Sequence, residues 1–381
     1  MHIMKPKIIT VFTEGDSNKL STWSNVPFFL TNTLEKKGYI INRVDVNSNK
    51  IIRGIYNKII LKIIKRLFNK KTEYYLNRTT YFEKRVERKM KRATKKYKDT
   101  DIFISTSFSY SPWKFTNKKT VLFCDWTIDY YYKYFLNRKP DRLERGAIER
   151  QDTQIDHSDY VISLFPDVTN YMKEKYSNKN IFYLGNVINS VLDVNMEQIL
   201  KSKLESFSIL FIGGKKYIEG AKSLIMAYDS LKLKYPRIIV NIIGISKEQF
   251  SYLPSEINCY GYLDKSKEKD KRVYYRLMSE AKLIINTTPK WAAFSATVEA
   301  MYWYTPVITT PYASFVKTFG TNINFGYYCE KNDPELINRF ISKILQLSDS
   351  DYLNMCQSAN KVVQQFSWDN YVNKLLKAIS E

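Results

Sequence analysis

The sequence has few residues of the kinds that hold metal ions or form covalent cross-links. Its four cysteines lie far apart and form no CxxC pair, and its two histidines are His2, at the terminus, and His157. Neither a zinc site nor a disulfide framework is indicated, and a reducing cytosol is the expected compartment. A catalytic histidine is not expected either, because His157 precedes a strand-like run at the predicted end of a helix.

Long apolar runs and two common nucleotide motifs are also missing. No run of about 18 apolar residues occurs, and the N-terminal stretch IITVF is too short for a signal-peptide core. We therefore expect a cytoplasmic protein that does not span a membrane. The GxGxxG fingerprint and the Walker loop are absent from the sequence, so hydride transfer and nucleotide hydrolysis lack specific support.

Positive charge is abundant and unevenly spread. The formal net charge is +22, and residues 50–98 hold 18 Lys or Arg against three Glu. This segment opens as IIRGIYNKIILKIIKRLF, in which isoleucines recur at helical spacing among basic residues, so a basic amphipathic helix is predicted. Its apolar stripe would either pack on its own domain or contact an anionic membrane surface. Nucleic acid is not an expected partner, because no nucleic-acid-binding motif accompanies the charge.

Strand-like and helix-like segments alternate along the chain, which predicts an α/β fold with parallel sheets. Five strands are expected in the first half, at 7–12, 39–46, 101–106, 120–124 and 159–164. A looser polar stretch near 190–205 precedes a new strand at 207–214. We therefore predict two doubly wound domains, with ligands bound at the carboxyl ends of their strands. The predicted boundaries are 1–190 for the first domain, with a basic insertion at 50–98, 206–362 for the second, and 363–381 for a closing helix.

Two features of the second domain have the chemistry of a nucleotide site. Gly213 and Gly214 follow a strand and precede a helix, so their N–H groups are predicted to approach a diphosphate, whose charge Lys215 and Lys216 would neutralise. A surface turn with two solvated lysines is the alternative. Glu299, expected on the first turn of a helix, offers two oxygens to the vicinal hydroxyls of a ribose. An ordinary helix-starting acid is the alternative for this residue.

Loops of the first domain supply candidates for the other substrate. The loop DWTIDYY follows a predicted strand and places Asp125, Trp126 and Asp129 at the ligand-binding edge. Gly15 and Asp16, in TEGDSN after the first strand, are further candidates, although a plain turn explains them equally well. The string DSD at 349–351 matches a metal-binding Asp-x-Asp pattern, but it precedes an apolar periodic helix and is predicted to cap it.

The segments FIGGKKYIEGAKSLIMAY, GYLDKS, EAMYWYTPVITT and FSWDNYVNKLL, in this order, resemble the GT-B glycosyltransferases, specifically the retaining family 4 (group 1). The resemblance implies two Rossmann-like domains facing a central cleft, with the last helix crossing back to the N-terminal domain. It also assigns Glu299 to the donor ribose and gives Asp125 a cleft-facing catalytic role, orienting an acceptor or sugar hydroxyl.

The sequence departs from this family pattern at two positions. Trp291 stands where members usually carry an acid that contacts the transferred sugar, and Glu219 replaces a basic residue of the phosphate loop. Lys215, Lys216 or Lys290 would have to compensate for the lost cation.

The resemblance predicts a retaining, metal-independent transferase without a bound cofactor. Its donor would be a nucleotide-diphosphate sugar and its acceptor a glycan, expected to be a lipid-linked intermediate of surface-polysaccharide biosynthesis at the inner face of the plasma membrane. Front-face transfer, in which the donor phosphate helps to take the acceptor proton, needs no protein nucleophile. The alternative is a catalytically degenerate GT-B protein that binds a glycan, nucleotide or partner without transferring sugar.

Overall fold

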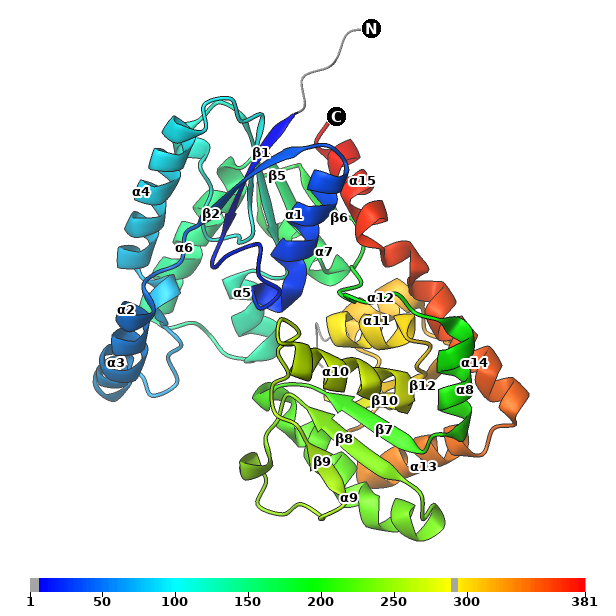
Figure 1. Ribbon diagram of the computed structural model, residues 1–381. Coiled ribbons are helices and arrows are strands. Elements are labelled where there is room, and N and C mark those ends of the chain that lie inside the picture. The colour runs from blue at the N-terminus through cyan, green and yellow to red at the C-terminus, as the bar shows by residue number, and fades with distance from the viewer. Residues whose placement is uncertain (1–6, 289–293, 381) are drawn as a thin grey trace, which may run out of the picture. The chain divides into compact units, whose positions relative to one another are not determined.

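The computed structural model describes residues 7–288 and 294–380, which form two compact units (Figure 1). The first unit comprises residues 1–185 and 371–381, and the second comprises residues 186–370. Each contains a six-stranded parallel sheet within the described residues. The predicted α/β class with two doubly wound domains is therefore confirmed. None of the described helices is both long and apolar enough to cross a membrane.

The sheet of the first unit has the strand order β2-β1-β3-β4-β5-β6. Its strands are β1 (Ile8–Thr13), β2 (Ile40–Asp45), β3 (Ile102–Ser105), β4 (Lys119–Cys124), β5 (Tyr160–Ser163) and β6 (Ile181–Tyr183). The five expected strands lie within one residue of their predicted ends. Most of them are nearly continuous apolar runs, which are typical of strands with both faces covered. The chain reverses direction across the sheet between β1 and β3, so their carboxyl ends form a topological switch point.

The helices of the first unit include those of the basic insertion at residues 50–98. They are α1 (Val26–Lys36), α2 (Lys50–Ile55), α3 (Leu61–Leu67), α4 (Thr80–Lys96), α5 (Ile128–Tyr130), α6 (Arg142–His157) and α7 (Pro166–Lys175). A π-helical turn, Tyr56–Ile60, joins α2 to α3. Helix α4 packs its apolar face on Phe12 and Phe103 of the sheet, and Ile52 of α2 packs against the same core cluster; α2 and α3 lie near one end of α4 (Figure 1).

The second unit repeats the architecture with the strand order β12-β11-β10-β7-β8-β9. Its strands are β7 (Ser208–Ile212), β8 (Ile239–Ile243), β9 (Ile257–Cys259), β10 (Ala281–Asn286), β11 (Val307–Thr309) and β12 (Gly326–Tyr328). The accompanying helices are α8 (Met196–Glu205), α9 (Ile218–Lys234), α10 (Glu268–Glu280), α11 (Phe294–Tyr302), α12 (Ala313–Phe319), α13 (Pro334–Leu345) and α14 (Asp349–Val363). Here the switch point lies between β7 and β10, so the segments that follow these two strands meet at one edge.

The unit boundaries differ from those expected from composition. The stretch near 190–205 contains helix α8, which packs against α10 and α14, so the second unit begins at Asn186. The final helix, α15 (Trp368–Ala378), rejoins the first unit from Tyr371 onward. The Tyr371 ring lies 5.8 Å from that of Phe123, and Lys119 Nζ donates to the carbonyl of Ile379 at 2.5 Å. The predicted return of the last helix is thus confirmed.

Helix α8 carries a buried lysine, Lys203, whose hydrogen-bond acceptors among the described residues are neutral oxygen atoms. The Lys203 ammonium donates to the carbonyls of Met278 (3.0 Å) and Ala281 (2.7 Å) and to the Thr305 hydroxyl (2.9 Å). Burial lowers the pKa of Lys203 from 10.5 to about 7. Between these values the unfolded chain holds a proton that the folded protein has lost, so raising the pH favours folding.

From Lys203 we expect a rise of about 1–2 kcal/mol in the free energy of unfolding between about pH 7 and 8.5, opposed toward the upper end by the cysteines of the unfolded chain, which begin to lose their protons there. Lys203→Met should remove most of this slope, leaving a smaller contribution from Lys282, whose pKa burial also lowers. Urea denaturation across this pH range measures the effect. An unchanged slope in the variant would show that Lys203 stays protonated in the folded state.

Candidate functional site

The turn after β7 is held by close packing between glycines. Gly213 donates its N–H to the carbonyl of Ile243 (3.0 Å), at the end of β8. A Cβ on Gly244, which has a φ of +96°, would lie 2.5 Å from the Gly213 carbonyl oxygen, so only glycine fits there. Gly244 in turn donates to the carbonyl of Gly261 (2.7 Å), after β9. The carboxyl ends of three neighbouring strands therefore meet at the predicted phosphate turn.

This geometry changes the predicted role of Gly213. Its N–H is already hydrogen-bonded to Ile243, so a bound diphosphate would have to accept hydrogen bonds from other groups of the turn. Gly214 is exposed and accepts a hydrogen bond from Tyr217 N–H (2.9 Å). Lys215 and Lys216 are exposed beside it, and the Lys216 ammonium lies 4.9 Å from the centre of the Tyr217 ring. The turn thus presents two exposed cations, an arrangement that fits both the predicted diphosphate site and the alternative of a surface turn with two solvated lysines.

The first turn of α9 packs tightly against the segment after β10. A Cβ on Gly220 would lie 2.7 Å from Thr288 Oγ1, so this glycine permits the close approach. Glu219 points to solvent, where it pairs with Lys222 at 2.8 Å, and therefore supplies no positive charge to the turn. Lys290 and Trp291, both predicted donor-site residues, lie outside the described residues.

Glu299 is buried in a polar cluster on α11. Its side chain is 3% exposed, and Lys265 Nζ donates to both carboxylate oxygens at 3.0 Å. The Tyr275 hydroxyl donates to Oε1 and the Tyr274 hydroxyl to Oε2, each at 3.0 Å. Burial, reinforced by the Glu299 charge, raises the pKa values of both tyrosines, which therefore remain hydrogen-bond donors.

The expectation that Glu299 lies on the first turn of its helix is wrong. Helix α11 is described from Phe294, which places Glu299 in its second turn. The helix dipole acts mainly within the first turn, so it is not the source of stabilisation. Lys265 and the two tyrosines stabilise the buried charge instead. GYLDKS contains Lys265, but nothing in its sequence indicates an ion pair with a residue 34 positions away.

Asp125 and Trp126 lie in a cavity of about 150 Å³ at the carboxyl edge of the first unit's sheet. Asp125 Oδ1 accepts from the Trp126 N–H at 2.9 Å, and the Trp126 ring stacks on Phe165 with centroids 6.2 Å apart. The other lining residues are Glu14, Asn77, Arg78, Ser107, Phe108, Ser109, Cys124, Ile128, Tyr131 and Gln151. The cavity lies at the β1/β3 switch point, where an open sheet of this type binds ligands.

Glu14 and Arg78 are cavity residues that the sequence analysis did not single out. Burial raises the pKa of Glu14 to about 7, against the opposing effect of Arg53, whose Nη2 lies 3.7 Å from Glu14 Oε2. Glu14 directly follows β1 and precedes the predicted Gly15. Its place directly after a strand could therefore have identified it as a candidate site residue. Arg78 belongs to the basic insertion, and its approach to β1 depends on tertiary folding.

Three other predicted residues are engaged elsewhere. Gly15 donates its N–H to Asp45 Oδ1 (2.9 Å), and Asp16 Oδ1 accepts from Asn18 N–H (2.9 Å), which organises the loop itself. Asp129 pairs with Lys175 at 2.9 Å and accepts from the Tyr171 hydroxyl. The structure thus brings Asp125 and Trp126 together in the cavity, whereas Gly15, Asp16 and Asp129 are not among its lining residues.

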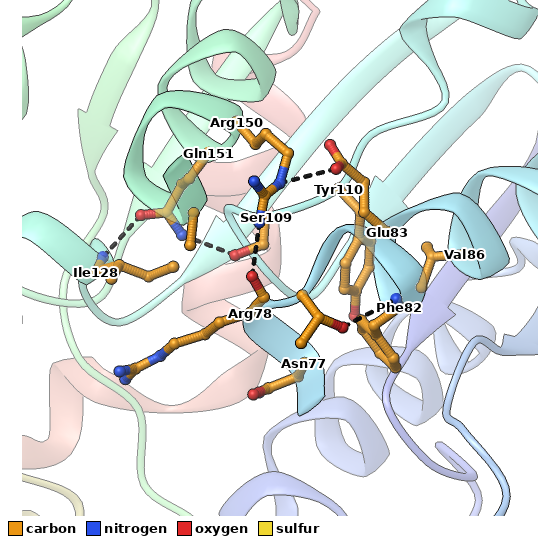
Figure 2. Close-up of a pocket in the computed structure, with 12 residues that line it drawn as sticks. Asn77, Arg78, Phe82, Glu83, Val86, Ser109, Tyr110, Ile128, Arg150 and Gln151 are labelled. Atoms are coloured by element: carbon orange, nitrogen blue, oxygen red, sulfur yellow. Dashed lines mark hydrogen bonds and ion pairs between the residues drawn. The ribbon is translucent and has the colours of Figure 1, made fainter. Parts of the chain in front are cut away.

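A second, smaller cavity of about 20 Å³ adjoins the same residues (Figure 2). Gln151 accepts from Ile128 N–H (2.7 Å) and donates to Ser109 (2.8 Å), while Arg150 pairs with Glu83 (2.8 Å) and donates to the Arg78 carbonyl (2.6 Å). This space accommodates about one water molecule. Its polar network fixes the backbone around Arg78, so it supports the larger cavity.

Residues 195–365 match the family model described as glycosyl transferases group 1. The match covers most of the second unit, including the Gly213–Gly214 turn and Glu299. It supports the resemblance inferred from the sequence and a glycosyltransferase activity. No curated protein gives a significant match to the sequence.

Solved structures of three proteins illustrate the likeness, two of them over nearly the whole chain. HepE of Anabaena, in complex with UDP and glucose, has a TM-score of 0.62 at 12% identity, covering 99% of this chain and 100% of HepE. Sucrose-phosphate synthase from Thermosynechococcus elongatus has a TM-score of 0.66 at 12% identity, covering 98% of each chain. A TarM mutant of S. aureus, in complex with fondaparinux, alpha-GlcNAc-glycerol and UDP, has a TM-score of 0.57 at 16% identity, covering 78% of this chain and 59% of TarM. At such identities the likeness establishes the fold, which is GT-B.

Proposed function

We propose that the protein is a retaining glycosyltransferase that moves a sugar from a nucleotide-diphosphate donor to a glycan acceptor. The observation that carries this proposal is the group 1 match over residues 195–365, in a chain whose full length resembles GT-B structures. The β7/β10 switch point supplies the donor site, with Lys215 and Lys216 at the diphosphate and Glu299 at the ribose. HepE and TarM were solved with UDP, so uridine diphosphate is the first nucleotide to test.

The proposed transfer uses positioned charge and needs no protein nucleophile. Negative charge develops on the diphosphate as the sugar leaves, and the two exposed lysines of the turn would stabilise it without a metal ion. In front-face transfer the acceptor oxygen bonds to the anomeric carbon on the face from which the diphosphate leaves, which gives retention, and the departing phosphate helps to take the acceptor proton. Asp125 would orient the acceptor or sugar hydroxyl from the first unit.

The acceptor side of the proposal rests on the cavity around Asp125. Carboxylates accept hydrogen bonds from sugar hydroxyls, and the aromatic face of Trp126 suits a sugar ring. TarM was solved with a glycan-like ligand, alpha-GlcNAc-glycerol. We propose a lipid-linked glycan acceptor in the biosynthesis of a surface polysaccharide.

A lipid-linked acceptor requires access to a membrane, and helices α2 and α3 have a suitable surface. Ile51, Ile55, Ile59, Ile63 and Leu67 are all exposed there. The alternative, that the segment packs on its own domain, holds for Leu61, which is buried, and for Ile52, which packs on the core of the first unit, but it does not account for these exposed side chains. They alternate with basic residues, a combination that favours an anionic bilayer. We propose peripheral association with the inner face of the plasma membrane through this segment.

The catalytically degenerate alternative has one structural observation in its favour. Glu299, the proposed ribose ligand, already holds four hydrogen bonds from neighbouring side chains. A protein whose carboxylate stayed in this arrangement would bind a glycan or partner without using a nucleotide sugar.

A nucleotide screen distinguishes the two functions. UDP, GDP, ADP and CMP are compared by thermal shift and calorimetry, followed by UDP-sugar turnover in the presence of membrane extract. At 100 times its dissociation constant, a ligand adds about 2.7 kcal/mol to the unfolding free energy, so a selective rise of several degrees is expected for one diphosphate. Stabilisation without turnover would favour the degenerate protein, and no response to any nucleotide would refute the proposed donor site.

A further inference from the structure

The hydrogen bonds around Glu299 match the demands of a ribose diol in number and position. A carboxylate has about four acceptor positions, and in this structure four hydrogen bonds from three side chains fill them. Lys265 takes one position on each oxygen, and each tyrosine takes one more. The two vicinal hydroxyls of a ribose would likewise each donate one hydrogen bond, one to each carboxylate oxygen of Glu299. Departure of Lys265 alone would therefore make room for the diol, while the tyrosines kept the carboxylate in place.

A departing Lys265 needs a second anion. Its side chain is only 10% exposed, and an ammonium in such surroundings is costly to leave without a partner. Lys265 also donates to the carbonyl of Asn189 (2.9 Å), but this neutral oxygen does not replace a carboxylate. The diphosphate of a nucleotide would supply negative charge at the moment when its ribose takes over Glu299.

The backbone places Lys265 within reach of such a diphosphate. Gly261, four residues earlier, is hydrogen-bonded to Gly244, which packs directly on Gly213 of the phosphate turn. Four residues span at most about 14 Å, and the flexible lysine side chain adds further reach. The Lys265 backbone therefore lies no more than about 14 Å from Gly261, which is hydrogen-bonded beside the turn where Glu219 leaves a positive charge missing.

On this basis, and resting on the proposed nucleotide site, we propose that Lys265 is a movable positioning residue. Without ligand it occupies the ribose positions on Glu299. On nucleotide binding it moves from Glu299 to the diphosphate and supplies the cation that Glu219 does not. Binding of the ribose and binding of the diphosphate are thereby coupled. The ribose displaces Lys265 from Glu299, and the diphosphate gives the displaced ammonium a new anionic partner. A nucleoside without phosphates must displace Lys265 without offering it a new partner.

Calorimetric titration with UDP and uridine tests this exchange. The ratio of their dissociation constants, uridine to UDP, measures the contribution of the diphosphate. In Lys265→Met we expect this ratio to fall at least about tenfold, the value of one charge-assisted contact, because uridine gains a vacant site and UDP loses a cation. Lys265→Arg should retain most of the ratio. Lys271→Met is the matched control, since Lys271 lies on neighbouring α10 and pairs with an exposed glutamate, Glu268.

Each outcome decides between specific explanations. Equal losses of UDP and uridine affinity in Lys265→Met, with an unchanged ratio, would make Lys265 a structural residue and overturn the exchange alone. Lack of UDP, GDP and ADP binding by the wild-type protein would overturn the nucleotide site itself. If Lys265→Met does not fold, Lys265→Gln gives the same comparison, because its amide keeps donors for Glu299 but carries no charge.

Discussion

Glu299→Ala is expected to lower the free energy of unfolding by about 3–5 kcal/mol, because removing one partner of a buried ion pair leaves the other charge uncompensated. Lys265 would lose both of its bonds to the carboxylate, and the hydroxyls of Tyr274 and Tyr275 would lose their acceptor. The same variant should lose measurable binding of both UDP and uridine. Chemical denaturation and calorimetry measure the two effects separately.

Two further variants separate the charge from the packing around Glu299. In Glu299→Ala/Lys265→Met no buried charge is left alone, so the loss of stability should fall below about 2 kcal/mol. Glu280→Ala removes an exposed ion pair with Arg276 on α10 and should cost less than about 1 kcal/mol. A double variant as unstable as Glu299→Ala would mean that packing, and not the ion pair, accounts for the loss.

The fold was predictable because its main signals are local. Runs such as IITVF and VLFC are almost wholly apolar, which is typical of parallel strands covered on both faces, and Gly38 ends α1 with a φ of +85°. The boundary at Asn186 was not predictable from composition. Helix α8 is polar in sequence but buries Ile199, Leu200 and the whole of Lys203. A lysine at an interior position appears as a solvent-exposed residue in any hydropathy pattern.

The candidate site was predictable only where its residues directly follow strands. Asp125 after β4 and Gly213 after β7 were placed at the correct sheet edges by this rule alone. The partners of Glu299 come from α10 and from the loop before it, at separations of 24 to 34 residues. Pairings over such distances depend on how α10 and α11 pack. Arg78 was missed for the same reason, since it reaches the cavity from the insertion.

The surface of α2 and α3 should bind anionic vesicles, and removing its charge should nearly abolish that binding. Each basic residue close to an anionic bilayer contributes about 1 kcal/mol. Replacing the four basic residues Lys58, Lys62, Lys65 and Arg66 with glutamine is therefore expected to lower partitioning onto phosphatidylglycerol-rich vesicles about 10³-fold. Co-sedimentation at several salt concentrations measures the loss, and pure phosphatidylcholine vesicles give the uncharged reference.

The contribution of the apolar side chains can be isolated with a charge-neutral variant. Ile59→Ser/Ile63→Ser keeps every cation but removes two exposed isoleucines, each of which contributes about 1.5–3 kcal/mol when fully buried, so even partial insertion predicts a loss of tenfold or more. Replacing Lys91, Arg92, Lys95 and Lys96 of α4 with glutamine removes the same charge from a helix whose apolar face is buried, and should weaken binding far less. Equal losses from the two charge variants would indicate attraction by net charge alone. Intact binding of the isoleucine variant would show that the lipid headgroups, and not the acyl region, are what this surface contacts.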